Sequence, residues 1–285
     1  MTFKFFLLRI CGLLFSSLWI VSCEKELEFS YHDIAPLIVI EGELTPSGIC
    51  VGITYTTPMD EPMDRTHLTD ATVMLEDITS GFSYILSPDK EGYYIHDVGG
   101  ESGHEYRLSI ERAGCRYVAE TMMYAPTRII GLEFNWIKMP YDYVAVLQGI
   151  FEDNPDISGE CYWVKVLRNG QMYMWGETDD RSAHDGILTY MRLTSRRDID
   201  EEEENEVLVD GDVVSVSVSR ISRQMYEYLE ALGNGSNGPA MFSGDRCLGY
   251  FMATSPVSDS VVFHPDDIPE YRLRRPSINL IGETQ

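Results

Sequence analysis

The sequence has few basic residues. Its 285 residues include 22 Lys and Arg against 46 Asp and Glu, which gives a net charge of −24 at pH 7 and a pI near 4.5. A protein that binds DNA or RNA needs clustered cations to contact the phosphates. We therefore expect no nucleic-acid partner.

The sequence also lacks the common motifs of catalytic and metal sites. It contains no Walker motif, no H-E-x-x-H, no G-x-S-x-G and no C-x-x-C. One G-x-G-x-x-G, Gly233 to Gly238, follows a predicted helix, whereas a dinucleotide fingerprint follows a strand and opens a helix. We expect no enzyme, no metal and no cofactor. Hydrolases that use two carboxylates leave no local motif, so that class stays open.

After the N-terminus, the sequence lacks any apolar run of the ~18 residues that a membrane-spanning helix needs. Residues 1–22 combine Lys4 and Arg9 with a short apolar stretch, the pattern of a signal peptide. The next residues complete the tetrapeptide Ile20-Val21-Ser22-Cys23. It resembles the bacterial lipobox, in which the cysteine is acylated and the chain is cut immediately before it. We predict lipidation at Cys23; the alternatives are an ordinary secretory signal with an incidental cysteine, or a membrane anchor helix.

Residues 23–36 are then a lipidated tether. Each buried CH₂ of an acyl chain contributes about 0.8 kcal/mol, so two or three chains hold a protein at a membrane. The acidic stretch Glu24 to Glu28 resembles the surface-export tag of Bacteroidetes lipoproteins; the alternative is a plain solvated tether. We expect a lipid anchor in the outer membrane, with the cell surface favoured over the periplasmic face.

Short apolar stretches alternate with turn residues about every ten positions from Leu37 onward, a spacing typical of β-sandwiches. We predict a mainly β protein. Residues 37–125 form an Ig-like or carboxypeptidase-regulatory-like sandwich. Residues 128–265 form a second β-rich domain, and residues 266–285 a C-terminal tail.

One short helix is predicted within the second domain. Ser222 can cap its N-terminus and Gly233 can end it, which places the helix near 222–232. Its apolar face is expected to contain Met225, Tyr228, Leu229 and Leu232. The stretch Leu248–Ala253 is expected to be a late strand of the same domain.

Asn169-Gly170 is a strong signal for a two-residue hairpin turn. Such a turn pairs Arg168 with Gln171, Val166 with Tyr173, and Val164 with Trp175. This register places Tyr173 and Trp175 in the core, and it places Trp163 and Lys165 on the opposite face. We name Trp163 and Lys165 as candidate ligand-binding residues, with packing in the core or between domains as the alternative.

Two acidic segments are candidate cation sites. Residues 198–206 hold seven acids in nine positions, a pattern that favours a solvated loop over a cation site. Asp153, Asn154 and Asp156 form a better oxygen cluster, but Asn154-Pro155 is also a plain turn.

Four cysteines follow Cys23, and an exported protein can form disulfides. They are Cys50, Cys115, Cys161 and Cys247. Two fall in each predicted domain, which favours the pairs Cys50–Cys115 and Cys161–Cys247 among three connectivities. Buried free cysteines are an equally open alternative.

Several short motifs follow the lipobox in a fixed order. They are Ile-Val-Ile-Glu-Gly (38–42), Gly-Tyr-Tyr (92–94), Tyr-Arg-Leu-Ser-Ile (106–110), Asp-Asn-Pro (153–155), Cys-Tyr-Trp (161–163) and Leu-Gly-Tyr-Phe (248–251). Over residues 23–263 this order resembles the Bacteroidetes lipoprotein family catalogued as domain of unknown function 4249. The family has no established catalytic residues.

Members of that family often lie beside TonB-dependent outer-membrane transporters. The resemblance therefore implies a binding accessory to nutrient uptake. A structural or adhesive surface module, and a direct glycan-binding protein without a transporter, are the alternative functions.

The lipid anchor can be tested by metabolic labelling with palmitate. We expect label in the wild-type protein and none in Cys23→Ala, because only the Cys23 thiol would be acylated. Equal label in both proteins would contradict the prediction.

Overall fold

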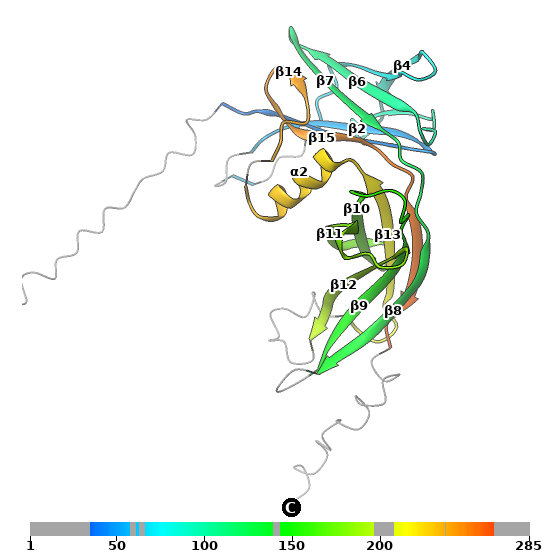
Figure 1. The fold of residues 1–285 in the computed structure, drawn as a ribbon. Helices are drawn as coiled ribbons and strands as arrows, with labels where there is room; N and C mark the ends of the chain where they lie inside the picture. Colours follow the sequence, from blue (N-terminus) through cyan, green and yellow to red (C-terminus); the bar gives the residue numbers. More distant parts are fainter. Residues whose placement is uncertain are drawn as a thin grey trace, which may run out of the picture. The chain divides into compact units, whose positions relative to one another are not determined.

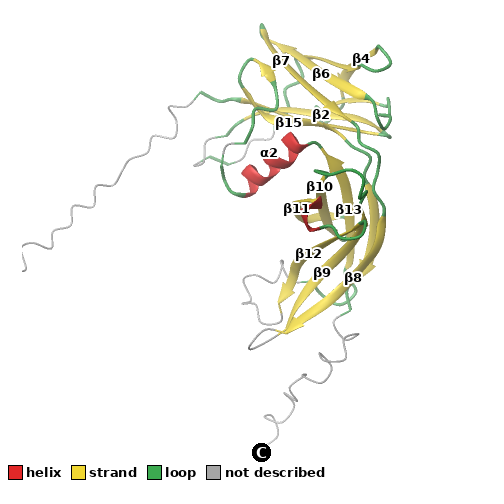
Figure 2. Ribbon diagram, viewed as in Figure 1, coloured by secondary structure: helices red, strands yellow, loops and turns green. Residues whose placement is uncertain are grey.

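The structure, a computed structural model, describes residues 35–57, 61–62, 66–138, 143–196, 208–236 and 238–264. Strands dominate these residues, and α2 (Arg223–Gly233) is the α-helix among them (Figure 2). The prediction of a mainly β protein is therefore confirmed. In the part of the chain that is described, no helix has the length and apolarity to cross a bilayer. The signal peptide, Cys23, the acidic segment 198–206 and the predicted tail lie outside the described residues.

One sheet has nine strands in the order β14-β7-β6-β3-β4-β5-β2-β1-β15 (Figure 1). The bounds are β1 Ile38–Thr45, β2 Gly48–Tyr55, β3 Thr72–Asp77, β4 Phe82–Pro88, β5 Tyr94–His96, β6 Glu105–Arg112, β7 Cys115–Met122, β14 Ser243–Gly244 and β15 Cys247–Ala253. Every second residue of β1, from Ile38 to Leu44, is buried, as expected for a strand with one face on a core. Residues from β7, the second strand of this order, and from β15, the last, meet in a single core. The sheet therefore folds over on itself as a sandwich.

Two further sheets pack face to face. One has the order β11-β10-β13-β16 and the other β12-β9-β8. Their bounds are β8 Ile129–Lys138, β9 Tyr143–Glu152, β10 Cys161–Arg168, β11 Gln171–Asp179, β12 Ile187–Arg196, β13 Val213–Ile221 and β16 Val257–Val262. Val164, Val216 and Val218 of the first sheet share a core with Leu147 and Phe151 of the second.

One late strand, β15, belongs to the nine-stranded sheet rather than to the β10–β13 sheet. It leaves the β10–β13 sheet after β13, and β15 then pairs in parallel with β1, from Ile38–Cys247 to Leu44–Ala253. It returns at β16 to pair with β13. Leu248–Ala253 is therefore a strand, as predicted, but it pairs with β1 rather than with a strand of the second predicted domain; a parallel partner far away in sequence leaves no local signal. The predicted limits 37–125 and 128–265 stay predictions.

The short helix lies where the sequence places it. The Ser222 hydroxyl accepts a hydrogen bond from the backbone N–H of Met225 at 3.1 Å, and Asn234 caps the other end. The buried residues are Met225, Tyr226 and Leu229, whereas Leu232 is 54% exposed. The prediction of the apolar face is therefore wrong at one position: Tyr226 is buried where Leu232 was expected to be.

The hairpin turn and the predicted pair Arg168–Gln171 are confirmed, but the predicted register beyond them is not. Asn169 and Gly170 both have positive φ, 51° and 84°, as this turn requires. Beyond the turn the register shifts, so that Val166 pairs with Met174 and Lys165 with Trp175. The predicted pairs Val166–Tyr173 and Val164–Trp175 are wrong, because a bulge inserts one extra residue in β11.

Gly249 sets the distance between β1 and β15. Its φ is +100°, and a Cβ at this position would lie 1.9 Å from the backbone oxygen of Ile40. Gly81, between β3 and β4, also has positive φ (+79°), but a Cβ there would meet open space. The two glycines differ in the room around them.

We therefore expect Gly249→Ala to lower the free energy of unfolding by about 3 kcal/mol or more, through backbone strain and the clash together. The matched variant Gly81→Ala carries only the strain of positive φ, about 1–2 kcal/mol. Urea unfolding of both variants measures the difference, and equal losses would contradict this account of the β1–β15 ladder.

Candidate functional site

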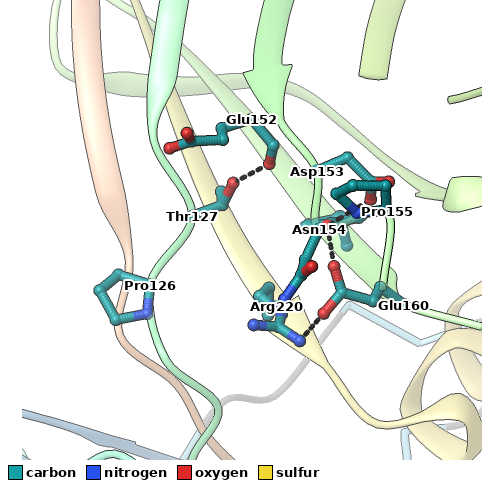
Figure 3. Close-up of a pocket in the computed structure, with 9 residues that line it drawn as sticks. Pro126, Thr127, Glu152, Asp153, Asn154, Pro155, Glu160 and Arg220 are labelled. Carbon is teal, nitrogen blue, oxygen red and sulfur yellow. Dashed lines mark hydrogen bonds and ion pairs between the residues drawn. The ribbon is translucent and has the colours of Figure 1, made fainter. Parts of the chain in front are cut away.

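A cavity of about 360 Å³ lies where the ends of β9 and β13 meet the start of β10 (Figure 3). Its lining is mostly polar. The residues that line it are Pro126, Thr127, Glu152, Asp153, Asn154, Pro155, Glu160, Tyr162 and Arg220. This is a size at which ligand pockets occur.

The turn after β9 supplies one wall. The side chain of Asn154 accepts a hydrogen bond from the backbone N–H of Asp156 at 3.1 Å, which closes the turn. Asp153 is held by its backbone N–H, which donates to the Gly186 carbonyl at 2.9 Å. The oxygen cluster named from the sequence is therefore a turn, and the described residues contain no group of three or more metal-ligating side chains that could hold a metal ion.

Glu160 is fixed from the opposite side. The backbone N–H groups of Gly159 and Glu160 both donate to one carboxylate oxygen of Asp180, at 2.6 and 2.9 Å. Asp180 begins the short 3₁₀ helix η2 (Asp180–Ser182). These two hydrogen bonds fix the backbone just before β10. The Glu160 side chain points from this backbone toward Arg220 (Figure 3).

The base of the cavity is an ion pair between a half-buried arginine and a buried carboxylate. The Arg220 guanidinium contacts Glu160 Oε1, with the two side chains 17% and 3% exposed. The guanidinium also lies 5.7 Å from the centre of the Tyr124 ring. Burial lowers the pKa of Arg220 from its ordinary value, opposed by Tyr124 and Asp153. The pair is costly to break, because the partner left behind would be an uncompensated buried charge.

The Tyr162 hydroxyl joins two carboxylates. Its oxygen lies 2.9 Å from Glu160 Oε2 and 3.1 Å from Asp153 Oδ1, and all three residues are buried. Burial raises the pKa of Tyr162, and the neighbouring Asp153 raises it further, so the phenol stays protonated. A phenol has one proton to donate, so it serves only one of the two carboxylates at a time.

The outer edge of the cavity is solvated. Glu152 is exposed and forms an ion pair with Arg128 at 3.0 Å. The Thr127 hydroxyl donates to the Glu152 carbonyl, which ties the segment before β8 to the end of β9 (Figure 3).

Trp163 and Lys165 lie elsewhere, in a packed joint. Trp163 is 8% exposed, and its ring meets those of Trp175 and Tyr250 edge-on at 6.4 and 6.0 Å. Lys165 Nζ lies 4.1 Å from the centre of the Trp163 ring and 3.1 Å from Glu43 Oε2. These contacts fit the packing alternative, because β10 is covered on both faces.

The four described cysteines are free, so neither predicted disulfide pair is present. Cys50 is exposed on β2, whereas Cys161 is buried in the core beneath α2. Burial raises the pKa of Cys161 to about 11, which keeps its thiol protonated. It behaves as a small core residue.

Comparison with known families gives one match. The family model described as Domain of unknown function (DUF4249) matches residues 24–258. The chain belongs to this family. The comparison of this chain with curated proteins found no match.

Solved structures that match this DUF4249 protein include distant likenesses. A two-domain fibronectin type III segment of chicken tenascin is 12% identical, with 80% of this chain and 100% of that one covered, at a TM-score of 0.24. A Bacteroides uniformis protein, provisionally described as carbohydrate binding, is 8% identical over 79% and 98% of the two chains, also at 0.24. We draw neither fold nor function from likenesses at this TM-score.

The sequence predicts residues of one wall of the cavity but not those of its base. Sequence patterns indicate Asp153 and Asn154, but they do not indicate Glu160, Tyr162 or Arg220 as site residues. Glu160 and Tyr162 flank Cys161, in a motif that marks the start of a strand. Arg220 is 60 positions further along than Glu160 and carries no signal of its partner.

Arg220→Met tests the ion pair at the base of the cavity. We expect the variant to lose about 3–5 kcal/mol of unfolding free energy, since Glu160 is left buried without its partner. The control Arg128→Met removes an exposed partner of Glu152 and should change little. Denaturant unfolding compares the two variants, and a similar small loss in both would show that the buried pair is not a structural requirement.

Proposed function

We propose that this protein is a lipid-anchored outer-membrane lipoprotein that serves as a binding accessory to a TonB-dependent nutrient uptake system. The signal sequence and lipobox support the anchor at Cys23, and the acidic residues after it support the cell surface. Membership of the DUF4249 family is consistent with this proposal and assigns no activity of its own.

The observation that carries the binding role is the cavity with its buried polar network. Protein cores exclude charged groups unless these are paired, so a charged network beside a cavity is a specific arrangement. The side chains that line it come from the ends of β9, β10 and β13 and from short turns. Such elements hold a site in place before a ligand arrives.

Binding fits these side chains better than catalysis does. Of the two buried carboxylates, Glu160 is tied to Arg220 and Tyr162, so it is not free to transfer a proton to a substrate. The other, Asp153, faces the same Tyr162 hydroxyl, and Glu152 is exposed and paired with Arg128. We therefore propose no catalytic role and no cofactor.

The test is co-purification from detergent-solubilised outer membranes. We expect the tagged full-length protein to bring down a TonB-dependent transporter, since the anchor places both at one membrane. A fusion of residues 1–36 to an unrelated domain controls for association through the lipid alone.

An equal yield of transporter with that fusion, or no transporter with the full-length protein, would contradict the proposed accessory role. The adhesive surface module and the direct glycan binder would then be the leading functions.

A further inference from the structure

The cavity holds more buried negative charge than it neutralises. Among its lining residues, Glu152, Asp153 and Glu160 are acids and Arg220 is the basic residue. Glu152 is neutralised at the surface by Arg128, and Glu160 by Arg220. Asp153 forms no ion pair with any described residue.

Asp153 is also buried, with 8% of its surface exposed. Arg220 acts on it through space, but the ion pair of that guanidinium is with Glu160. Two buried carboxylates therefore share one cation. A buried charge without a counter-ion is costly, and proteins pair such charges.

The hydrogen bonds show the same deficit. The Tyr162 hydroxyl is the described side-chain group that hydrogen-bonds to the Asp153 carboxylate, and it lies between Asp153 and Glu160. When its proton goes to Glu160, Asp153 keeps an oxygen facing the phenol with no donor. The site thus lacks one donor and one positive charge at the same place.

We propose that the cavity takes a small ligand bearing an ammonium group, which would be placed against Asp153. An ammonium supplies both missing features, since it carries the charge and three N–H donors. A neutral hydroxyl supplies a donor only, and an anion would add to the acidic lining. This proposal rests on the proposed binding function and gives it a ligand class.

Sugars of one size and different charge are suitable probes. We expect glucosamine to bind, and glucose and glucuronate to bind at least about tenfold more weakly, because a buried charge pair discriminates by this much or more. Ethanolamine serves as a smaller ammonium probe. Chemical shifts in ¹H–¹⁵N spectra of the full chain measure the four titrations.

Two acids of one turn provide the matched variants. Asp153→Asn removes the buried charge, and Asp156→Asn removes an exposed charge three positions away that does not line the cavity. We expect the first to weaken the binding of glucosamine about tenfold or more and the second to leave it unchanged. Both change the net charge of the protein equally, so a long-range effect of charge would alter both alike.

A second pair covers the case in which Asp153→Asn fails to fold. Pro126 is an exposed lining residue, so Pro126→Lys brings an ammonium of the protein to the cavity. It should weaken glucosamine binding, whereas Pro126→Glu should not.

Equal binding of the three sugars, a preference for glucuronate, or no binding of either amine would overturn the proposal. So would equal effects of Asp153→Asn and Asp156→Asn. These results are independent of the transporter. Amine binding without a co-purified transporter removes the accessory role alone, and a transporter without amine binding removes the ligand class alone.

Discussion

The parallel pairing of β15 with β1 is the contact on which the rest of the described fold depends. It forces the chain to leave the β10–β13 sheet, join the nine-stranded sheet and return at β16. The pairing is possible because Gly249 lets its backbone approach Ile40 where a side chain would clash. Just after β15, Thr254 donates its backbone N–H to the Leu44 carbonyl and its hydroxyl to the Arg220 carbonyl, at 2.9 and 3.5 Å. One residue therefore contacts both β1 and the strand that carries the base of the cavity.

Strand β10 is the second element that connects these parts. Tyr162 and Val164 face the core between the two smaller sheets, while Cys161 and Trp163 face the core beneath α2. Burial on both faces is unusual for a strand in an antiparallel sheet, where one face commonly meets water. Lys165 then reaches Glu43 on β1, so an ion pair adds to the apolar contact. The aromatic cluster around Trp163 is thus the packing of a joint, which explains why it offers no surface to a ligand.

The cavity is a polar exception beside these apolar cores. A buried ion pair contributes less to stability than well-packed apolar residues of the same volume often would. The Arg220–Glu160 pair and the Tyr162 hydroxyl are therefore poorly explained by stability alone. They fit the proposed binding role, since charged and hydrogen-bonding groups fixed around a cavity select ligands by charge and by donor pattern. The acidic balance of the whole chain, with a net charge of −24, acts in the same direction by attracting cations.

Local patterns in the sequence determined a good part of this structure. The short apolar stretches separated by turn residues, the capped helix after Ser222 and the turn at Asn169-Gly170 each depend on neighbouring residues, so each could be predicted. The bulge in β11 could not, because one inserted residue is chosen by packing on both faces rather than by the turn. It moved Trp175 to the face of Trp163 and thereby closed the face that the predicted register had left open.

The candidate site divides in the same way. The turn at Asp153 and Asn154 was visible in the sequence because Asx and Pro residues act on their own backbone. The meeting of Asp153 with Glu160, Tyr162 and Arg220 was not visible, since Arg220 reaches Glu160 only through the antiparallel register of β10 with β13. Likewise, no local pattern marks residues 247–253 as partners of residues 38–44. The sequence by itself determined the short strands, the turns between them and the capped helix. The tertiary structure alone decided which strands pair across long stretches of chain, because that choice depends on contacts between residues far apart in sequence. The same strand pairing decided where two buried carboxylates come to share one cation.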